Sequence, residues 1–486
     1  MAGIGWRLER LIDRGSLTGV AGAYATGAAV MALPWLLTTA VLMMLPLVID
    51  RAHGDFATAD AAVRVAYAVA LLVGAPLQVV ASRHSADRVY ERRIHALAAP
   101  FRRALALALV VCASCAAIAL AALGVPATIV WCGAALAAGV GAAWTALAVG
   151  NGLCSPTLVL GAVVFGAITS FALAALGMVE IGVTGYLLGL TFGQCVMLIV
   201  LLAGLWHALP AWVDETERLL PAFRDYAALA GAGLAFNAAL WIDKLIVQLV
   251  ADRETAGYHS SGSMLAWTAT VPCLAWIFVE IETTFHRHVR AFYLDLERGV
   301  SLTELERDAR ALAGDVARLL RGALIVQAGT LVFVQLAAPR IASVFGFPHA
   351  ATLPFQLLLI ASCFQAVAMA GLIALYYFDL RRDALRAALC MLAAVAVLTL
   401  AAHGLDLVPA AGTAVGCALG AIATARLAWR GARGVLEDTL LIQPFAVERA
   451  PGLRRRRTGR RLFARLARTP RHMLGARRGV GTRSHH

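Results

Sequence analysis

Two ionisable residues lie side by side inside an apolar stretch of this chain. The stretch is 241-WIDKLIVQLV-250, and the two residues are Asp243 and Lys244. Lys244 is the only lysine, whereas every other residue in the Lys+Arg count of 42 is an arginine. An ionised side chain near the centre of a membrane span costs roughly 2.5–3.5 kcal/mol on insertion scales, and such residues mark substrate or ion paths. The pair therefore directs the functional question to the helix that carries it.

The charges of Asp243 and Lys244 are expected to be balanced by residues of other helices. Neighbouring residues on a helix point in different directions, so these two are not expected to neutralise each other. Arg340 is expected at nearly the same depth, and Arg64, near the outer end of its helix, is a second candidate. One interpretation is a net-positive lining of a water-filled cavity. The other is a structural Asp243–Arg340 bridge, with Lys244 reaching outward to the interface.

Aromatic and polar residues extend the expected substrate path. Asn237, Trp241 and Trp276 lie deep in predicted helices. Indole rings can serve as platforms for the apolar faces of sugar rings, and membrane-interface belts are the alternative. The interface interpretation is favoured for Trp131 and Trp267, which lie near predicted helix ends. Two acidic residues are expected close to the cytoplasmic face, as the mouth of the path or as interfacial residues at a helix end: Glu280 and Glu282.

Membrane-spanning helices must position these residues. Hydrophobic residues make up 60% of the chain and charged residues 15%, with a mean hydropathy of +0.76. A soluble domain has about a quarter charged residues. Recurring long apolar runs predict an all-α, polytopic membrane protein. About twelve spans are expected, at 20–49, 61–81, 104–123, 125–149, 157–179, 182–206, 227–250, 263–285, 322–345, 352–378, 384–403 and 408–429.

Arginines set the orientation of these spans. With the N-terminus inside, 21 basic residues fall in or beside the cytoplasmic connections, and only Arg51 and Arg253 fall in the opposite loops. This bias predicts that both termini lie in the cytoplasm. The tail adds another 15 arginines. We expect the basic loops and tail to contact anionic lipid headgroups, or the tail to be merely solvated, rather than to bind nucleic acid.

The predicted organisation has four parts, which are an N-terminal six-helix bundle (1–206), a cytoplasmic connection (207–226), a C-terminal six-helix bundle (227–429) and a basic cytoplasmic tail (430–486). Within the C-terminal bundle, 301–320 is predicted to be a cytoplasmic amphipathic helix. Ser301 and Glu304 form a capping-box pattern, and an apolar stripe runs from Leu302 to Leu319. This helix is expected either to dock a cytoplasmic partner or to lie on the membrane and lead into the next span.

Motifs of several enzyme classes are absent from the sequence. A Walker A loop needs Gly-Lys-Ser/Thr, but the sole lysine is flanked by Asp243 and Leu245. No H-E-x-x-H zinc motif occurs. The nine cysteines lie mostly in apolar runs and are expected to be small buried residues rather than disulfides or metal ligands. The sequence thus predicts a transporter rather than an enzyme, with no cofactor.

Four sequence blocks carry a family resemblance, and they follow one another in order between residue 1 and about residue 430: 1-MAGIGWRLERLIDRGSLTG-19, 236-FNAALWIDK-244, 272-PCLAWIFVEIETTF-285 and 375-LYYFDLRRDAL-385. Together with Tyr24 and 34-PW-35, they resemble the Pel exopolysaccharide transporter family (PelG-like). That family belongs to the superfamily of polysaccharide flippases and multidrug/oligosaccharidyl-lipid exporters.

This resemblance implies export of a cationic, hexosamine-rich exopolysaccharide from the cytoplasm by a synthase-dependent complex in biofilm formation. It implies partners as well, namely a cytoplasmic glycosyltransferase and membrane proteins that include a cyclic-di-GMP receptor. A lipid-linked oligosaccharide flippase or a cation-coupled drug exporter on the same fold is the alternative. A scaffold for the glycosyltransferase, without a path of its own, is the alternative from a separate class.

Overall fold

The computed structural model describes residues 10–12, 16–49, 56–209 and 219–441. Over these residues the chain is helical and contains no strand. Eleven helices are long and apolar enough to cross a membrane, and one pair of shorter helices that meet at a bend supplies a twelfth span. The prediction of an all-α fold with about twelve membrane spans is confirmed.

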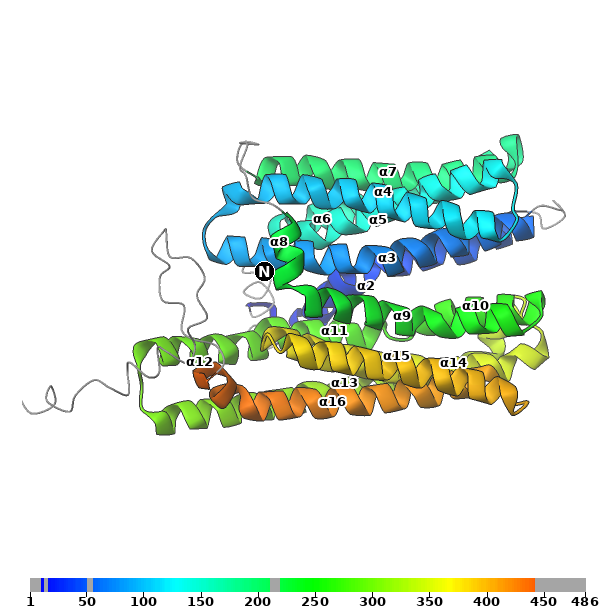
Figure 1. The fold of residues 1–486 in the computed structure, drawn as a ribbon. Coiled ribbons are helices and arrows are strands. Elements are labelled where there is room, and N and C mark those ends of the chain that lie inside the picture. Colours follow the sequence, from blue (N-terminus) through cyan, green and yellow to red (C-terminus); the bar gives the residue numbers. More distant parts are fainter. Residues whose placement is uncertain (1–9, 13–15, 50–55, 210–218, 442–486) are drawn as a thin grey trace, which may run out of the picture.

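The long helices of the first half of the chain pack mainly on one another (Figure 1). They are α2 (Leu17–Val48), α3 (Phe56–Tyr90), α4 (Ala98–Ala122), α5 (Ala127–Leu153), α6 (Pro156–Ile181) and α7 (Val183–Ala208). The close approach of α6 and α7 depends on glycine, because a Cβ atom at Gly177 or Gly185 would overlap the carbonyl oxygen of the other. In a membrane such small residues allow the tight backbone packing that holds helices together.

The second half of the chain forms the other group of helices in Figure 1. They are α9 (Ala227–Val250), α10 (Arg253–Thr268), α11 (Val271–Glu280), α12 (His286–Arg298), α13 (Leu302–Val344), α14 (Thr352–Tyr377), α15 (Arg381–Gly404) and α16 (Pro409–Leu441). The short α8 (Leu219–Asp225) lies beside the first group, where it packs on α3 and α4 as well as on α9. Helix α2 contacts both groups, since it packs on α6 of the first and on α11 of the second. It therefore lies along the boundary between the halves.

One predicted span, 263–285, has different bounds in the structure. Helices α10 and α11 replace it and meet at a bend of 42°. Helix α10 begins at Arg253, because the Asp252 carboxylate accepts a hydrogen bond from the backbone N–H of Thr255 (2.9 Å) and caps the helix. At its other end α11 continues through a π-helical turn (Ile281–Phe285) into α12. The helix therefore does not end at residue 285 as predicted.

Helix α13 is a single helix of 43 residues, which joins the helix predicted over 301–320 to the next predicted span without a break. At about 1.5 Å per residue it is roughly 65 Å long, about twice the thickness of a membrane's hydrocarbon core. The predicted capping box is present. The Ser301 hydroxyl accepts from the Glu304 backbone N–H (3.3 Å), and the Glu304 carboxylate accepts from the Ser301 backbone N–H (3.0 Å).

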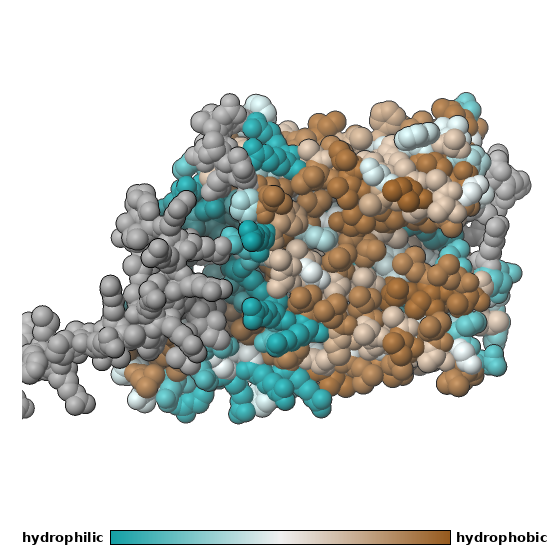
Figure 2. All heavy atoms as spheres, in the orientation of Figure 1, coloured by the Kyte–Doolittle hydropathy of each residue, from teal (hydrophilic) through white to brown (hydrophobic). Residues whose placement is uncertain are grey.

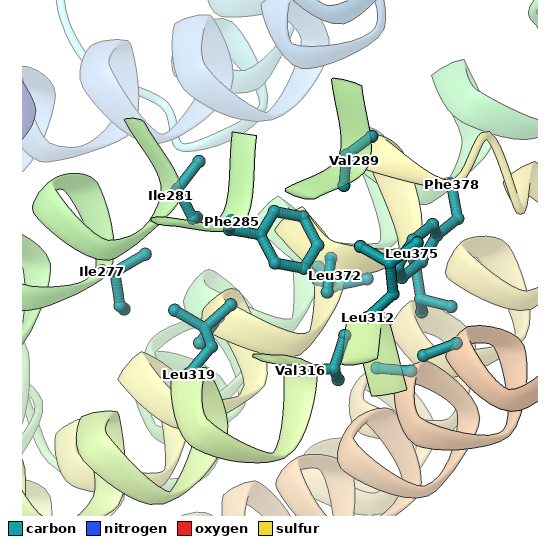
Figure 3. Packing of buried hydrophobic residues seen from close by; sticks show 14 of the residues in the cluster. Ile277, Ile281, Phe285, Val289, Leu312, Val316, Leu319, Leu372, Leu375 and Phe378 are labelled. Atoms are coloured by element: carbon teal, nitrogen blue, oxygen red, sulfur yellow. The ribbon is translucent and has the colours of Figure 1, made fainter. Parts of the chain in front are cut away.

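The apolar stripe at the start of α13 packs inside the protein. Figure 3 shows Leu312, Val316 and Leu319 facing Phe285 and Phe378, and all five side chains are buried. The stripe therefore neither docks a partner nor lies on the membrane, because α12 and α14 already cover it. The beginning of α13 and α12 instead form a hairpin that projects beyond the other helices (Figure 1).

The surface is divided into bands that fit a membrane. Figure 2 shows a broad apolar band, with hydrophilic residues gathered at the end of the molecule where α12 lies. Large apolar side chains are exposed on helices of both halves, including Trp131 (71%) of α5 and Phe333 (76%) of α13. The hydrophilic end carries the arginine-rich segments 83–103 and 287–321, and we call it the arginine-rich end. The first part of the predicted basic tail, 430–441, is the end of α16, and the rest of that tail lies outside the described residues.

Candidate functional site

A cavity of about 270 Å³ lies between the two groups of helices. Helices α2, α3 and α5 line it from the first half, and α9, α10, α11 and α14 line it from the second. Of the described residues that line it, Lys244 alone carries a charged side chain. Drug-sized ligands generally occupy pockets of about 300–1,000 Å³. The cavity as it stands therefore suits a small unit rather than a long chain.

One face of α9 lines this cavity. Its residues Phe236, Asn237, Leu240, Trp241 and Lys244 recur at the three- and four-residue spacing that brings side chains to one side of a helix. The structure thus places three predicted path residues, Asn237, Trp241 and Lys244, in one cavity. Asn237 also donates to the backbone carbonyl of Gly233 (3.0 Å).

Aromatic rings from both halves meet at the cavity. Trp35 of α2 and Trp267 of α10 are in edge-to-face contact, with ring centroids 5.8 Å apart and planes at 84°. Tyr67 of α3 and Trp144 of α5 add two rings from the first half. Trp267 was expected at the membrane interface, and this expectation is wrong. Helix α10 begins before the predicted span does, so Trp267 lies near its C-terminal end and lines the cavity.

The charged group at the cavity is a buried cluster of three side chains. Lys244 Nζ donates to Asp243 Oδ1 (3.1 Å) and to the backbone carbonyl of Leu240 (2.7 Å). His259 Nε2 of α10 lies 3.0 Å from the other carboxylate oxygen, Oδ2. Asp243 is 1% exposed and His259 is 4% exposed. The carboxylate thus lies inside the second half, and the ammonium lies between it and the cavity.

This geometry corrects the prediction that Asp243 and Lys244 do not neutralise each other. Their Cβ atoms do point apart, but the flexible lysine chain folds back along α9 and reaches the carboxylate. The predicted Asp243–Arg340 bridge is also wrong. Arg340 is exposed on α13, which packs against α11, α14 and α16 rather than against α9. Arg64 pairs with Asp60, one turn earlier in α3, and does not line the cavity.

The other predicted path residues lie outside the cavity. Trp276 stacks on Tyr24 of α2, with ring centroids 6.3 Å apart, and packs against Gly322 of α13. Glu280 and Glu282 are 9% and 7% exposed, so neither is the interfacial residue that one interpretation expected. They are buried because the helix continues past them through the π-helical turn into α12.

Towards the arginine-rich end, polar contacts join the two halves. Tyr226, just before α9, donates a hydrogen bond to the Asp87 carboxylate of α3. Arg83 of α3 pairs with Asp87 (3.2 Å) and also with Asp379, which precedes α15 (3.6 Å). Packing is tight beside these contacts, since a Cβ atom at Gly233 would lie 2.8 Å from Val79. The halves are therefore closed against each other on this side of the cavity.

Arg381 completes this group. It binds both carboxylate oxygens of Asp379 (2.8 Å each) and donates to the backbone carbonyl of Asp225 (2.8 Å). Its guanidinium also lies 4.7 Å from the ring centroid of Tyr226. Such two-pronged arginine–carboxylate pairs fix geometry as well as charge. We call Arg83, Asp87, Tyr226, Asp379 and Arg381 the clasp.

Sequence reasoning missed His259 and the clasp. His259 lies in 251–262, which was assigned to a loop because its polar residues lower the hydropathy. The Asp252 cap ahead of Thr255 is the signal that could have placed His259 on a helix. The clasp joins residues far apart in sequence, with 139 positions between Asp87 and Tyr226, and no spacing signal predicts such a contact.

The chain matches a known protein family. The family model described as "PelG: Putative exopolysaccharide Exporter (EPS-E)" matches residues 1–432. No curated protein matches the chain.

Solved structures share the fold at low identity. A MOP-superfamily transporter from Pyrococcus furiosus has a TM-score of 0.63 at 13% identity, over 86% of this chain and 96% of its own. An outward-facing multidrug resistance MATE transporter has a TM-score of 0.62 at 13% identity, over 85% of this chain and 95% of its own. An inward-facing multidrug resistance MATE transporter has a TM-score of 0.54 at 14% identity, over 88% of this chain and 96% of its own. The chain therefore has the fold of a MOP-superfamily transporter.

Proposed function

Because the chain belongs to the PelG family of exopolysaccharide exporters, we propose that it exports a Pel-like, hexosamine-rich polysaccharide from the cytoplasm across the bacterial inner membrane. We further propose that it works in a synthase-dependent biofilm complex. Its proposed partners are a cytoplasmic glycosyltransferase and membrane proteins that include a cyclic-di-GMP receptor. The observation that carries this proposal is the cavity between the halves, with aromatic rings from both of them.

The lining of the cavity is suited to sugar units. Indole rings present flat apolar surfaces to the apolar faces of pyranose rings, and Trp35, Trp241 and Trp267 supply such surfaces. The amides of Gln78 and Asn237 offer hydrogen-bond partners for sugar hydroxyl and acetamido groups.

In this proposal the clasp is the cytoplasmic gate. Its ion pairs and hydrogen bonds close the halves on the arginine-rich side, which the charge bias predicts to be cytoplasmic. A polymer entering from the cytoplasm must separate these partners. Movement of one half against the other is the common mode of transporters with two helix bundles and a site between them.

The test compares polymer export by variants of two cavity tryptophans with export by a variant of an exposed tryptophan. Trp241→Ala and Trp267→Ala each remove a ring from the cavity at an expected cost of about 1–2 kcal/mol, so export should slow about 5- to 30-fold. Trp131→Ala is the matched control, because this ring is 71% exposed and does not line the cavity. Polymer inside and outside the cells is quantified at matched protein levels. Equal export by all three variants would overturn the proposal.

The same strains separate the alternatives. A drug exporter predicts changed drug susceptibility and unchanged extracellular polymer. A lipid-linked oligosaccharide flippase predicts that short lipid-linked sugars, rather than long polymer, accumulate on the cytoplasmic side. A scaffold predicts that the cavity variants keep both glycosyltransferase binding and full export.

A further inference from the structure

We infer that a groove between α4 and α8 binds one anionic phospholipid, and that this lipid holds the clasp closed. The groove has a volume of about 550 Å³ and is open to the surface of the protein. The binding site is argued from the groove alone. Its effect on transport rests on the proposed function of the clasp as the cytoplasmic gate.

The walls of the groove are apolar except at one residue. Six of the described residues line it, which are Arg103, Ala106, Leu107 and Val110 of α4 and Leu219 and Leu220 of α8. The four residues of α4 recur at the three- and four-residue spacing of a single helix face. The side chains of Val110 and Leu220 are 64% and 79% exposed. Such walls gain free energy by contact with an acyl chain and lose it by contact with water.

The charged residue lies at the end of the groove where a headgroup is expected. Arg103 belongs to the arginine-rich segment 83–103 at the beginning of α4, whereas Val110 lies about 10 Å further along this helix. The groove therefore runs from an exposed arginine towards the middle of the apolar surface. A phospholipid has the same order of groups, with a phosphate at one end and apolar chains at the other.

The charges around the groove favour an anionic lipid. A guanidinium presents two parallel N–H groups that match phosphate oxygens, so Arg103 is suited to hold the phosphate. Helices α4 and α8 together carry three arginines, Arg102, Arg103 and Arg224, against one acidic residue, Asp225. A headgroup with a net negative charge therefore binds more favourably here than a zwitterionic one. A soluble anion has no use for the apolar walls, which is why we assign the groove to a lipid.

Helix α8 links the groove to the clasp. It packs on α3 and α4 of the first group and on α9 of the second, and it runs across these long helices rather than along them (Figure 1). The backbone carbonyl of its last residue, Asp225, accepts a hydrogen bond from Arg381. The next residue, Tyr226, donates to Asp87 of α3. The groove and the clasp thus lie at the two ends of one short helix.

An occupied groove should favour the closed clasp. An acyl chain between α4 and Leu220 adds contacts that hold α8 on the first half of the protein. Separation of the halves moves Tyr226 away from α3 and pulls α8 from α4, so these contacts are lost. A lipid that binds the closed form better shifts the population towards it by the ratio of its affinities for the two forms.

The first experiment measures lipid binding without any polymer. The purified full chain in detergent is titrated with phosphatidylglycerol, or with phosphatidylethanolamine that has the same acyl chains, and native mass spectrometry counts the bound lipids. We expect one phosphatidylglycerol to bind more tightly than the others. Arg103→Gln should weaken this first binding about fivefold, which is the effect of one arginine beside an anionic lipid. Val110→Trp should abolish it by filling the groove.

Two matched controls lie on the same helix. Arg102→Gln removes the same charge one position away from the groove, and Ile118→Trp adds the same ring at a position that is 70% exposed and does not line the groove. The first should weaken binding less than Arg103→Gln does, and the second should leave binding unchanged. Equal affinity for both lipids, equal loss in the two arginine variants, or binding that survives Val110→Trp overturns the site. Tighter binding of a polyprenyl phosphate than of phosphatidylglycerol also overturns it, and assigns the groove to a lipid carrier.

The second experiment measures the effect on the clasp. Thr38→Cys places a thiol in the cavity wall, and a membrane-impermeant maleimide is added to inverted vesicles from cells, whose membranes supply the anionic lipid. Arg103→Gln should speed labelling of this thiol by up to about fivefold, because the effect of the lipid on the clasp is limited by the loss in binding. Arg102→Gln should speed it less. Equal rates in the parent and in Arg103→Gln overturn the effect of the lipid on the clasp.

The two proposals fail in different ways. If Tyr226→Phe speeds labelling and Arg103→Gln does not, the gate stands and its control by lipid is overturned. If neither variant changes labelling while phosphatidylglycerol still binds through Arg103, the gate is overturned and the lipid site stands. Failure of the cavity tryptophan variants to affect export leaves the lipid site standing as well, because lipid binding is measured without polymer.

Discussion

Replacing Tyr226 by phenylalanine should open the clasp. The substitution removes one hydroxyl and keeps the ring on which Arg381 lies, so the hydrogen bond to Asp87 is the contact that is lost. Burial, followed by the hydrogen bond to Asp87, raises the pKa of the Tyr226 phenol above its ordinary value. The phenol therefore stays protonated at physiological pH and remains a donor to the carboxylate. Asp87 keeps its ion pair with Arg83.

The expected effect follows from the strength and exposure of this bond. A hydrogen bond to a charged group contributes about 1.5–3 kcal/mol when well buried. The Asp87 side chain is 32% exposed, so water replaces part of the lost bond and we expect about 1–2 kcal/mol. That difference raises the population open to the cytoplasm about 5- to 30-fold.

The assay reads access to the cavity from the cytoplasmic side. Thr38→Cys places a thiol in the cavity lining, and inverted vesicles are treated with a membrane-impermeant maleimide. The parent without this thiol gives the background from the nine native cysteines. Tyr226→Phe should speed labelling of the new thiol by the factor above. Tyr90→Phe should not, because Tyr90 is 84% exposed on α3, the helix that carries Asp87. Unchanged labelling in folded Tyr226→Phe, or an equal gain in Tyr90→Phe, would refute the clasp as a gate.

Four further outcomes are expected. Lys244→Arg should lower export at normal protein level, because the planar guanidinium of arginine cannot replace a compact ammonium held by two oxygen atoms. Full export by this variant would mean that Lys244 has only a structural role. Phe285→Ala should destabilise the protein by about 3–5 kcal/mol in denaturation assays, since the ring is fully buried. Ser301→Ala should cost about 1 kcal/mol by loss of the α13 cap; no change in either thermal midpoint would contradict the packing described. A cysteine at Glu297 should be labelled only from the cytoplasmic side, and periplasmic labelling would invert the orientation.

Hydropathy predicted most of the spans, because it acts residue by residue along the chain. It failed at α10, where His259 and its polar neighbours turn towards the protein interior and so escape the cost that lipid would impose. The misplaced start of this helix also put Trp267 at the interface instead of the cavity. A polar helix buried between other helices is a tertiary effect, which a hydropathy window does not see.

The candidate site was predicted in part for a related reason. Asn237, Trp241 and Lys244 share one face of one helix, so helical spacing alone brings them together. The partner of Asp243 depends on which helices pack against α9 and on how a flexible lysine chain folds, and neither follows from depth in the membrane. Arg340 was expected at a matching depth but lies on α13, which packs against α11, α14 and α16.

The central claim is that the polymer passes through the cavity between the halves. A photo-crosslinking amino acid at Met264, in the cavity wall, tests it during active export, with the same group at Trp131 on the lipid-facing surface as the control. Illumination should attach polymer to the protein at residue 264, seen as a hexosaminidase-sensitive increase in mass, and not at residue 131. Active export with no capture at residue 264, or with equal capture at both positions, would contradict a path through this cavity.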